Sequence, residues 1–356
     1  MKKGFAFLVC LCFLFFQQAI ACTTFFINKN GQLVFGRNYD WISDAGMVCT
    51  NLRGLGKTSV TQRDGSAISW VSKYGSITFN QYGKEFPTGG MNEKGLVVEL
   101  MWADGSQYPK ADARPAIGVL QWIQYQLDNN ATIEEVIASD AKIRISRDNP
   151  PLHYLIADAN GNAATIEFFN GKIEVHQGKD LPFPVLTNNP YTQSAKTAVD
   201  ANVLKGDTSF SFRDNSLQRF TKACSMVQQY QTATINKPVI DYAFDILNRV
   251  AQEDFTKWSI VYDIKNKKVF FKTADYQDVK SFSFNSFDFN CTATARVINM
   301  NQQMRGPVDK NFQPFSAEIN RSVMTKAVEE SKSQVTISDD EKEGNIAYAK
   351  KIKCKD

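Results

Sequence analysis

The end of an N-terminal leader sets which residue begins the folded chain. The sequence opens with two lysines after Met1, continues with an apolar stretch over residues 5–16, and then presents Ala19-Ile20-Ala21. A basic start, a short apolar run and a small-x-small site together are typical of a secretory signal peptide. We therefore expect residues 1–21 to be removed and Cys22 to become the first residue of the mature chain.

The leader also sets the expected location of the protein. Its apolar run is shorter than the roughly 20 residues that span a bilayer, and no later segment resembles a span. The sequence therefore predicts an exported protein, periplasmic or secreted, without stable membrane insertion.

A small residue before a cysteine also occurs in lipoprotein signals, where the cysteine is acylated and serves as an anchor. Ala19 stands where such signals usually carry leucine, and Ala19-Ile20-Ala21 suits ordinary cleavage. The two fates exclude each other, because lipidation would block both the thiol and the α-amine of Cys22. A lipid-anchored envelope binding protein is the alternative from another class.

Composition indicates an ordinary globular protein after the leader. Hydrophobic residues make up 43% of the chain and the net charge is a mild +4. This content can build the core of one domain over residues 22–356, with a charged tail from Ser331 onward that we expect to be loosely held. Basic residues do not gather into a stripe with aromatics, so no nucleic-acid partner is expected.

The cysteines beyond the leader do not have the spacing of a metal site. There is no CxxC pair, and the chain has two histidines, His153 and His176. We therefore expect no metal and no organic cofactor. Disulfides are possible in an oxidising compartment, but the spacing leaves their pairing open. The cysteines that follow Cys22 are Cys49, Cys224, Cys291 and Cys354.

Hydrophobic periodicity predicts blocks of strands separated by blocks of helices, which is typical of an α+β layered fold. A capping-box pattern, Thr132-x-x-Glu135, opens one helix, and Gly89-Gly90 predicts a tight turn. The strands are expected within residues 22–41, as a hairpin that turns at Asn28–Gly31, and within residues 66–79, 95–102, 153–157, 164–169, 172–176, 258–263 and 268–274. The helices are expected within residues 115–127, from Thr132 onward, and within residues 217–229 and 239–251.

An N-terminal cysteine combines a nucleophile and a base in one residue. Its free α-amine, with a reference pKa of about 7.7 to 8.0, can take the thiol proton near neutral pH. Arg37 and Asp40 follow the strand that should lie beside Cys22, where a cation favours thiolate and a carboxylate can hold the amine. The alternative is that Arg37 and Asp40 only pair with each other at the end of a strand.

Five segments occur in this order along the chain: Cys22-Thr23-Thr24-Phe25, Gly36-Arg37-Asn38-Tyr39-Asp40-Trp41, Gly90-Met91-Asn92-Glu93-Lys94-Gly95-Leu96, Leu186-Thr187-Asn188-Asn189-Pro190 and Arg219-Phe220. Together they resemble the choloylglycine hydrolase family, which includes bile salt hydrolases and penicillin V acylases. The resemblance extends over most of the chain after the leader. It implies a four-layer αββα sandwich of the N-terminal-nucleophile hydrolase type, with the cysteine at the start of an inner strand and often a homotetramer.

The same resemblance implies roles for individual residues. Cys22 resembles the family's nucleophile, and Arg37 resembles the cation beside the sulfur. Asp40 resembles the carboxylate that orients the α-amine. Asn188 resembles the oxyanion donor, and Arg219 a second arginine that organises the charged centre. The implied reaction is hydrolysis of a linear C–N amide bond in a small N-acyl amide through an acyl-thioester.

Trp102 departs from the bile salt hydrolase pattern, which commonly carries an asparagine at this place. The main-chain amide of Trp102 can still donate to an oxyanion, while the indole changes the pocket and removes a polar group. The expected activity is therefore like that of penicillin V acylases or acyl-homoserine-lactone acylases, and a conjugated bile salt hydrolase is the alternative. Loops over residues 57–73 and 206–215 are expected to set selectivity.

A papain-like pair of Cys224 or Cys291 with His153 is a rival arrangement, because one cysteine and one histidine are enough for it. No local sequence supports it. His153 lies in an apolar predicted strand, where a satisfied core histidine is the expected role.

Overall fold

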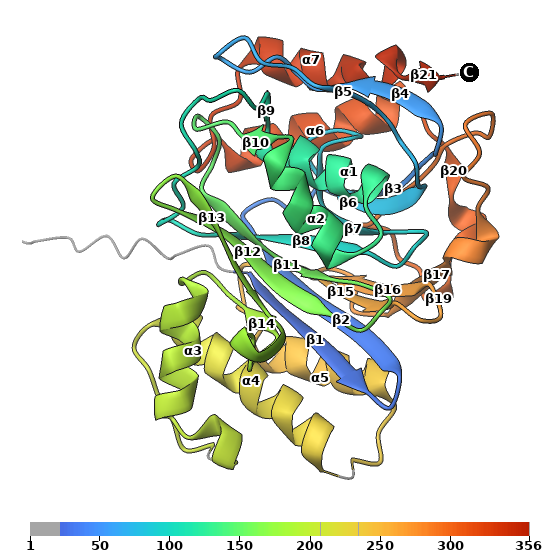
Figure 1. The fold of residues 1–356 in the computed structure, drawn as a ribbon. Helices are drawn as coiled ribbons and strands as arrows, with labels where there is room; N and C mark the ends of the chain where they lie inside the picture. Colours follow the sequence, from blue (N-terminus) through green and yellow to red (C-terminus); the bar gives the residue numbers. More distant parts are fainter. Residues whose placement is uncertain (1–21, 207, 234, 356) are drawn as a thin grey trace, which may run out of the picture.

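The computed structural model describes residues 22–206, 208–233 and 235–355 (Figure 1). The leader predicted over residues 1–21 lies outside the described residues. Two large sheets face each other, and helices cover the outer face of each (Figure 1). This is the αββα sandwich expected from the sequence.

The first sheet holds the N-terminal hairpin next to its centre. Helices α3 (Tyr191–Asp200), α4 (Asn215–Thr232) and α5 (Val239–Arg249) lie on its outer face, with α4 packed on β1 and α5 on β2. Its strands, in spatial order, are β14 (Val185–Leu186), β1 (Thr23–Lys29), β2 (Gln32–Asp40), β15 (Thr256–Asp263), β16 (Lys268–Thr273), β17 (Lys280–Ser283) and β19 (Gly306–Pro307).

The second sheet lies between the first sheet and another helical layer. Helix α1 (Val119–Asn129) packs on β7 and β8, and α2 (Ile133–Ala138) follows it. The strands, in spatial order, are β13 (Lys172–Gln177), β12 (Ala163–Phe169), β11 (Leu152–Ala157), β8 (Val97–Trp102), β7 (Pro87–Asn92), β6 (Ser76–Asn80), β3 (Met47–Asn51), β18 (Arg296–Asn299) and β20 (Gln313–Pro314).

Two smaller groups of strands complete the chain. Strands β9 (Ala116–Ile117) and β10 (Arg144–Ile145) pair next to α1, and β21 (Lys353–Cys354) pairs with β4 (Leu55–Thr58), which pairs in turn with β5 (Ser69–Val71). Helices α6 (Ala317–Ser331) and α7 (Asp339–Tyr348) pack on each other near these strands (Figure 1).

The N-terminal hairpin forms as the sequence predicts. Asn30 and Gly31 occupy its turn with φ values of 52° and 76°, the left-handed conformation that a tight hairpin turn requires. The register pairs Thr23 with Asn38, so Cys22 lies beside the end of β2, where Tyr39 and Asp40 follow. The turn therefore sets the position of the cysteine relative to β2.

The predicted helical pair and its capping box are confirmed. The Thr132 side chain accepts from the Glu135 amide, and the Glu135 carboxylate accepts from the Thr132 amide. The apolar side of α1, with Trp122 and Ile123, is buried against the second sheet. This burial supplies the hydrophobic stabilisation that a short helix lacks alone.

The tight turn predicted at Gly89-Gly90 is wrong. Both residues lie inside β7, where a glycine is needed because the sheet must leave room for a neighbouring side chain. A Cβ on Gly89 would lie 1.8 Å from Oε2 of Glu99, and one on Gly90 would lie 2.6 Å from the carbonyl of Ile77. These two positions therefore require glycine because neighbouring atoms pack closely against them, and the chain does not turn there.

The strand predicted over residues 66–79 is also wrong in part. The structure divides it into β5 and β6, which belong to different sheets. Gly75 lies between the two strands, where a Cβ would come within 2.4 Å of the Phe289 ring, so this position leaves no room for a side chain.

The charged tail from Ser331 is folded, contrary to expectation. Residues 339–348 form α7, whose capping box joins Ser338 and Glu341. A disulfide between Cys291 and Cys354 joins β21 to a distant part of the chain. Tertiary packing and this cross-link outweigh the local charge that predicted a loose segment.

Candidate active site

Cys22 lies at the bottom of a cleft and is 3% exposed. Its Sγ lies 3.8 Å from the carbonyl oxygen of Asp40. Burial raises the pKa of the thiol, while the charge of Arg37 and, to a smaller extent, that of Arg219 lower it. Because the net shift is upward, the thiol needs a base to become a nucleophile near neutral pH.

Asp40 closes β2 beside the cysteine. Its Oδ1 accepts from the Thr256 hydroxyl at 2.6 Å, and its Oδ2 accepts from Nε2 of Gln252 at 3.0 Å. Burial raises the pKa of the carboxyl to about 6, against the lowering effect of Arg219 and of these hydrogen bonds. Asp40 is thus a buried carboxylate held in one orientation.

Arg37 is fully buried below the cysteine and binds Glu99, not Asp40. Its guanidinium forms an ion pair with Glu99 and donates to the carbonyls of Thr88 at 2.9 Å and Leu100 at 3.2 Å. Within residues 22–206, 208–233 and 235–355 no ion pair joins Arg37 to Asp40, so the alternative in which the two only pair with each other is wrong.

Glu99 was not among the residues that the sequence singled out. It lies on β8 with its side chain fully buried, and it accepts from the Tyr262 hydroxyl at 2.5 Å. A glutamate inside the apolar run Val97–Trp102 was the available signal, because a buried charge requires a partner. Glu99 supplies the negative charge that lets Arg37 remain charged inside the protein.

Arg219 extends from α4 to the start of β1 and joins three parts of the site. It donates to the carbonyl of Cys22 at 2.6 Å, to Oγ1 of Thr23 at 2.5 Å and to Oδ1 of Asn188 at 2.9 Å. Asn215, one turn earlier, accepts from its Nε at 2.7 Å. The guanidinium thus holds the cysteine backbone and the Asn188 amide in one arrangement.

Asn188 follows β14 and contacts the end of β8. Its Nδ2 donates to the carbonyl of Trp102 at 2.8 Å, and its main-chain amide donates to Oγ of Ser216 at 2.9 Å. Since Oδ1 receives Arg219 and Nδ2 donates to Trp102, both ends of the amide have defined neighbours. The structure therefore brings together Cys22, Asp40, Asn188 and Arg219.

The cleft above the cysteine has a volume of about 880 Å³, and its lining combines aromatic and aliphatic side chains with polar and charged ones. Trp102 lies at its edge, half-buried, with its ring centre 6.0 Å from that of Trp41. Residues 60–63 contribute to the lining, as expected for the loop over residues 57–73, whereas no described residue of 206–215 does. The main-chain amide of Trp102 as an oxyanion donor stays a prediction; its carbonyl is the group that contacts Asn188.

The surroundings of Cys224, Cys291 and His153 exclude the papain-like arrangement. Cys291 is in the disulfide with Cys354, and Cys224 is buried in α4. The two ring nitrogens of His153 lie 2.9 Å from Glu167 and 2.7 Å from the carbonyl of Thr187. His153 is therefore a satisfied core histidine.

Within the described part of the chain, no group of His, Cys, Asp or Glu side chains is placed to hold a metal ion. No described helix is both long enough and apolar enough to cross a membrane.

Comparison with known proteins places this site in a family context. Residues 22–296 match the family described as linear amide C–N hydrolases, choloylglycine hydrolase family. The penicillin V acylase of Pectobacterium atrosepticum is 26% identical over 303 residues, which cover 72% of this chain and 79% of that protein.

Solved structures share the fold. Penicillin V acylase from Agrobacterium tumefaciens superposes with a TM-score of 0.72 at 24% identity, covering 83% of this chain and 98% of that one. A variant of the conjugated bile acid hydrolase from Clostridium perfringens gives a TM-score of 0.66 at 18% identity, over 80% and 98% of the two chains. Because the family match spans most of the chain and begins at the cysteine of the cleft, this protein belongs to the choloylglycine hydrolase family and is an amidase that acts on linear C–N amide bonds.

Proposed function

We propose that the mature protein hydrolyses a small N-acyl amide with Cys22 as an N-terminal nucleophile. The preferred substrates are of the penicillin V or acyl-homoserine-lactone kind, and a conjugated bile salt is the alternative. The observation that carries the proposal is the position of Cys22: it precedes β1 directly, lies at the bottom of the cleft, and has Asp40, Arg219 and Asn188 around it.

The first half of the proposed reaction uses the α-amine that removal of the leader creates. The amine takes the thiol proton, and the thiolate attacks the acyl carbonyl to form a tetrahedral intermediate. Asp40 orients the resulting ammonium, while the charges of Arg37 and Arg219 favour the thiolate, as their effects on the thiol pKa support. The ammonium then returns its proton to the leaving nitrogen.

The second half releases the acyl group. Water, activated by the α-amine, attacks the acyl-thioester, and the carboxylic acid leaves with Cys22 restored. In both halves Asn188 Nδ2 is the proposed donor to the oxyanion, in an orientation that its contacts with Arg219 and Trp102 support. A preorganised donor of this kind typically contributes roughly 2.7 to 4 kcal/mol of transition-state stabilisation.

The choice among substrates rests on the cleft. Trp41 and Trp102 lie close to each other in its lining and give it an aromatic surface, which suits an aromatic or aliphatic acyl group. The similarity to the penicillin V acylase of Pectobacterium atrosepticum supports the same preference.

We further propose that the protein is exported to the periplasm or secreted, and that it assembles as a homotetramer, as members of this family often do. The disulfide between Cys291 and Cys354 supports export, because such bonds form and persist mainly in oxidising compartments.

The decisive experiment offers the mature protein penicillin V, long-chain acyl-homoserine lactones and glycine-conjugated bile salts, with mass-spectrometric detection of the cleaved products. We expect cleavage of one of the first two, and its loss in the matched variant Cys22→Ser. Turnover that survives this substitution contradicts the proposed nucleophile.

Intact mass of the exported protein tests the alternative of another class. A chain beginning with an unmodified Cys22 contradicts a lipid anchor. A diacylated Cys22 contradicts the amidase mechanism, because it leaves neither thiol nor α-amine.

A further inference from the structure

One wall of the catalytic cleft comes from the C-terminal arm, which we define as residues 332–355. The residues of the arm that line the cleft include Val335, Ile337, Glu341 and Asn345. The family match ends at residue 296, so this wall is built by a part of the chain that lies beyond it. The cleft is therefore completed by residues that the family resemblance does not describe.

The arm presents an apolar strip to the cleft. Along residues 334–338 exposed and half-buried residues alternate, and the half-buried ones are Val335 and Ile337. Both residues belong to the lining of the cleft, so both contribute apolar surface to it. Both pack against the main hydrophobic core next to the cleft.

A chain of hydrogen bonds joins Ser331, the last residue of α6 before the arm, to Trp41, which follows β2 directly. Trp41 donates through Nε1 to the Tyr82 hydroxyl at 2.8 Å, and the Tyr82 hydroxyl lies 2.9 Å from Oγ of Ser331. Ser331 donates its single proton to the carbonyl of Ala327 at 2.5 Å, so Tyr82 must donate to Ser331. Each group therefore donates to the next, from Trp41 in the cleft lining through Tyr82 to Ser331 at the end of α6.

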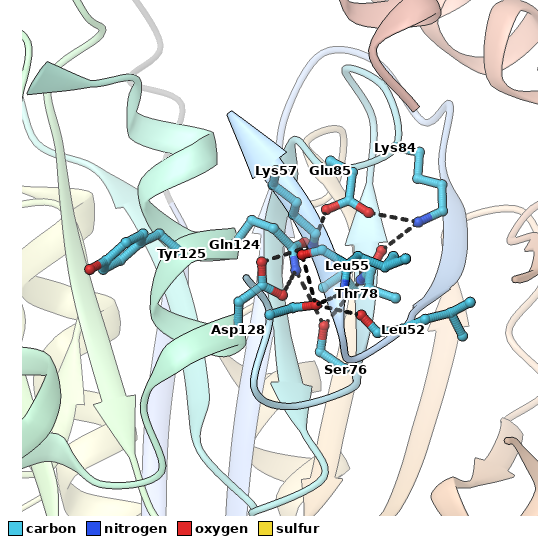
Figure 2. Close-up of polar contacts among 12 residues, drawn as sticks. Leu52, Leu55, Lys57, Ser76, Thr78, Lys84, Glu85, Gln124, Tyr125 and Asp128 are labelled. Atoms are coloured by element: carbon cyan, nitrogen blue, oxygen red, sulfur yellow. Dashed lines mark hydrogen bonds and ion pairs between the residues drawn. The ribbon is translucent and has the colours of Figure 1, made fainter. Parts of the chain in front are cut away.

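Figure 2 shows a buried ionic cluster that includes Lys57, Lys84, Glu85 and Asp128. Lys57 of β4 binds Glu85 at 2.5 Å and Asp128 at 2.8 Å, and Lys84 binds Glu85 at 2.9 Å. The two lysines balance the two carboxylates, which buried charges require. Glu85 has φ 74°, so this network also holds a backbone conformation that an L residue rarely adopts.

The ionic cluster and the arm are connected through several contacts. Asn320 of α6 accepts from the main-chain amide of Lys84 at 2.9 Å and donates to the carbonyl of Ile346 at 3.2 Å. Tyr348 donates to the carbonyl of Thr58 at 2.8 Å. With β21 paired to β4 and Cys354 cross-linked to Cys291, the arm is a fixed wall.

We propose that the C-terminal arm is the specificity-determining wall for the acyl group, with Val335 and Ile337 binding an apolar acyl chain. This inference rests on the proposed function. During hydrolysis the amine leaves after the first half, whereas the acyl group stays on the sulfur through both halves. A fixed apolar wall in the same cleft as Cys22 therefore stabilises the part of the substrate that stays, and its benefit grows with the length of the acyl chain.

The test compares two cleft variants, Val335→Ala and Ile337→Ala, with Val328→Ala as the matched control. Val328 is half-buried on α6 and packs against the same core but is not part of the cleft lining. The substrates are N-acyl 4-nitroanilides from butanoyl to dodecanoyl. We expect KM for the dodecanoyl substrate to rise about tenfold in the cleft variants, with little change in kcat or in KM for the butanoyl substrate.

A second measurement separates this inference from the proposed function. The Kd of dodecanoate is measured calorimetrically and needs no turnover. Weaker binding by about tenfold in both cleft variants, but not in Val328→Ala, supports the wall even if the wild type hydrolyses none of the substrates and the proposed function fails. Equal Kd values and an unchanged chain-length profile overturn the wall, whether or not hydrolysis depends on Cys22.

Discussion

Arg219 donates to Oδ1 of Asn188 at 2.9 Å and thereby fixes which end of that amide faces the carbonyl of Trp102. The same guanidinium holds the carbonyl of Cys22 at 2.6 Å. One arginine on α4 therefore contacts both Cys22, the proposed nucleophile, which precedes β1, and Asn188, the proposed oxyanion donor, which follows β14.

Replacing Asn188 by alanine should lower kcat by about a hundred- to a thousandfold with little change in KM, because an oxyanion donor acts mainly in the transition state.

Arg219→Lys should also lower kcat, since lysine keeps the charge but loses the fork that binds Asn188 and Cys22 together. Steady-state kinetics measures both, with Asn215→Ala as a control that removes one supporting contact of Arg219. A rise in KM with unchanged kcat would contradict the role of Asn188.

Glu99→Gln should destabilise the protein by about 3 to 5 kcal/mol, because it leaves the buried charge of Arg37 uncompensated. Chemical denaturation measures this change. The matched control is Glu93→Gln, which breaks the partly exposed ion pair with Arg53 and should cost less than about 1 kcal/mol. Equal effects of the two substitutions would show that the Arg37 charge does not depend on Glu99.

Asp40 should make stability depend on pH. Its pKa rises from 3.8 to about 6 on folding, so the folded state holds the proton more tightly than the unfolded state. The stabilisation from this group is therefore complete below pH 3.8 and is lost as the pH rises through 6. Between these limits the wild type should lose about 3 kcal/mol relative to Asp40→Asn.

The measurement compares the free energy of unfolding of the two proteins across this pH range. It uses a chain in which residue 22 stays internal, because a new α-amine would add a charge beside Asp40. Parallel curves for the wild type and Asp40→Asn would contradict the raised pKa.

Replacing both Cys291 and Cys354 by serine should lower the free energy of unfolding by about 4 kcal/mol, the loop-closure value for a sequence separation of 63 residues. Thermal unfolding in the presence and absence of a reductant measures it. The buried thiol of Cys49, replaced by serine, is the control that leaves the cross-link intact. Insensitivity of the wild type to reductant would show that the cross-link does not hold the arm.

Local patterns predicted those elements whose cause is local. The Asn30-Gly31 turn and the Thr132–Glu135 capping box are determined by a few neighbouring residues, and both are present. Gly89 was misread because its reason lies across the sheet, in the Glu99 side chain. The C-terminal arm was misread because its order depends on Cys291, far away in the sequence.

The same distinction applies to the site. The resemblance indicated Cys22, Asp40, Asn188 and Arg219, and the structure brings them together. It did not indicate Glu99, because no motif states which carboxylate will neutralise a buried arginine. Nor did it indicate Ile337, since the family match ends before the arm begins.

The register of the N-terminal hairpin determines where Cys22 lies relative to Asp40. Thr23 pairs with Asn38, so the cysteine sits one step ahead of the first rung and meets the strand end that carries Asp40. A one-residue insertion in β2 between its turn and Arg37 would turn the Arg37 side chain to the opposite face of the sheet, away from Glu99. The number of residues in the hairpin is therefore more restricted than the identity of most of its side chains.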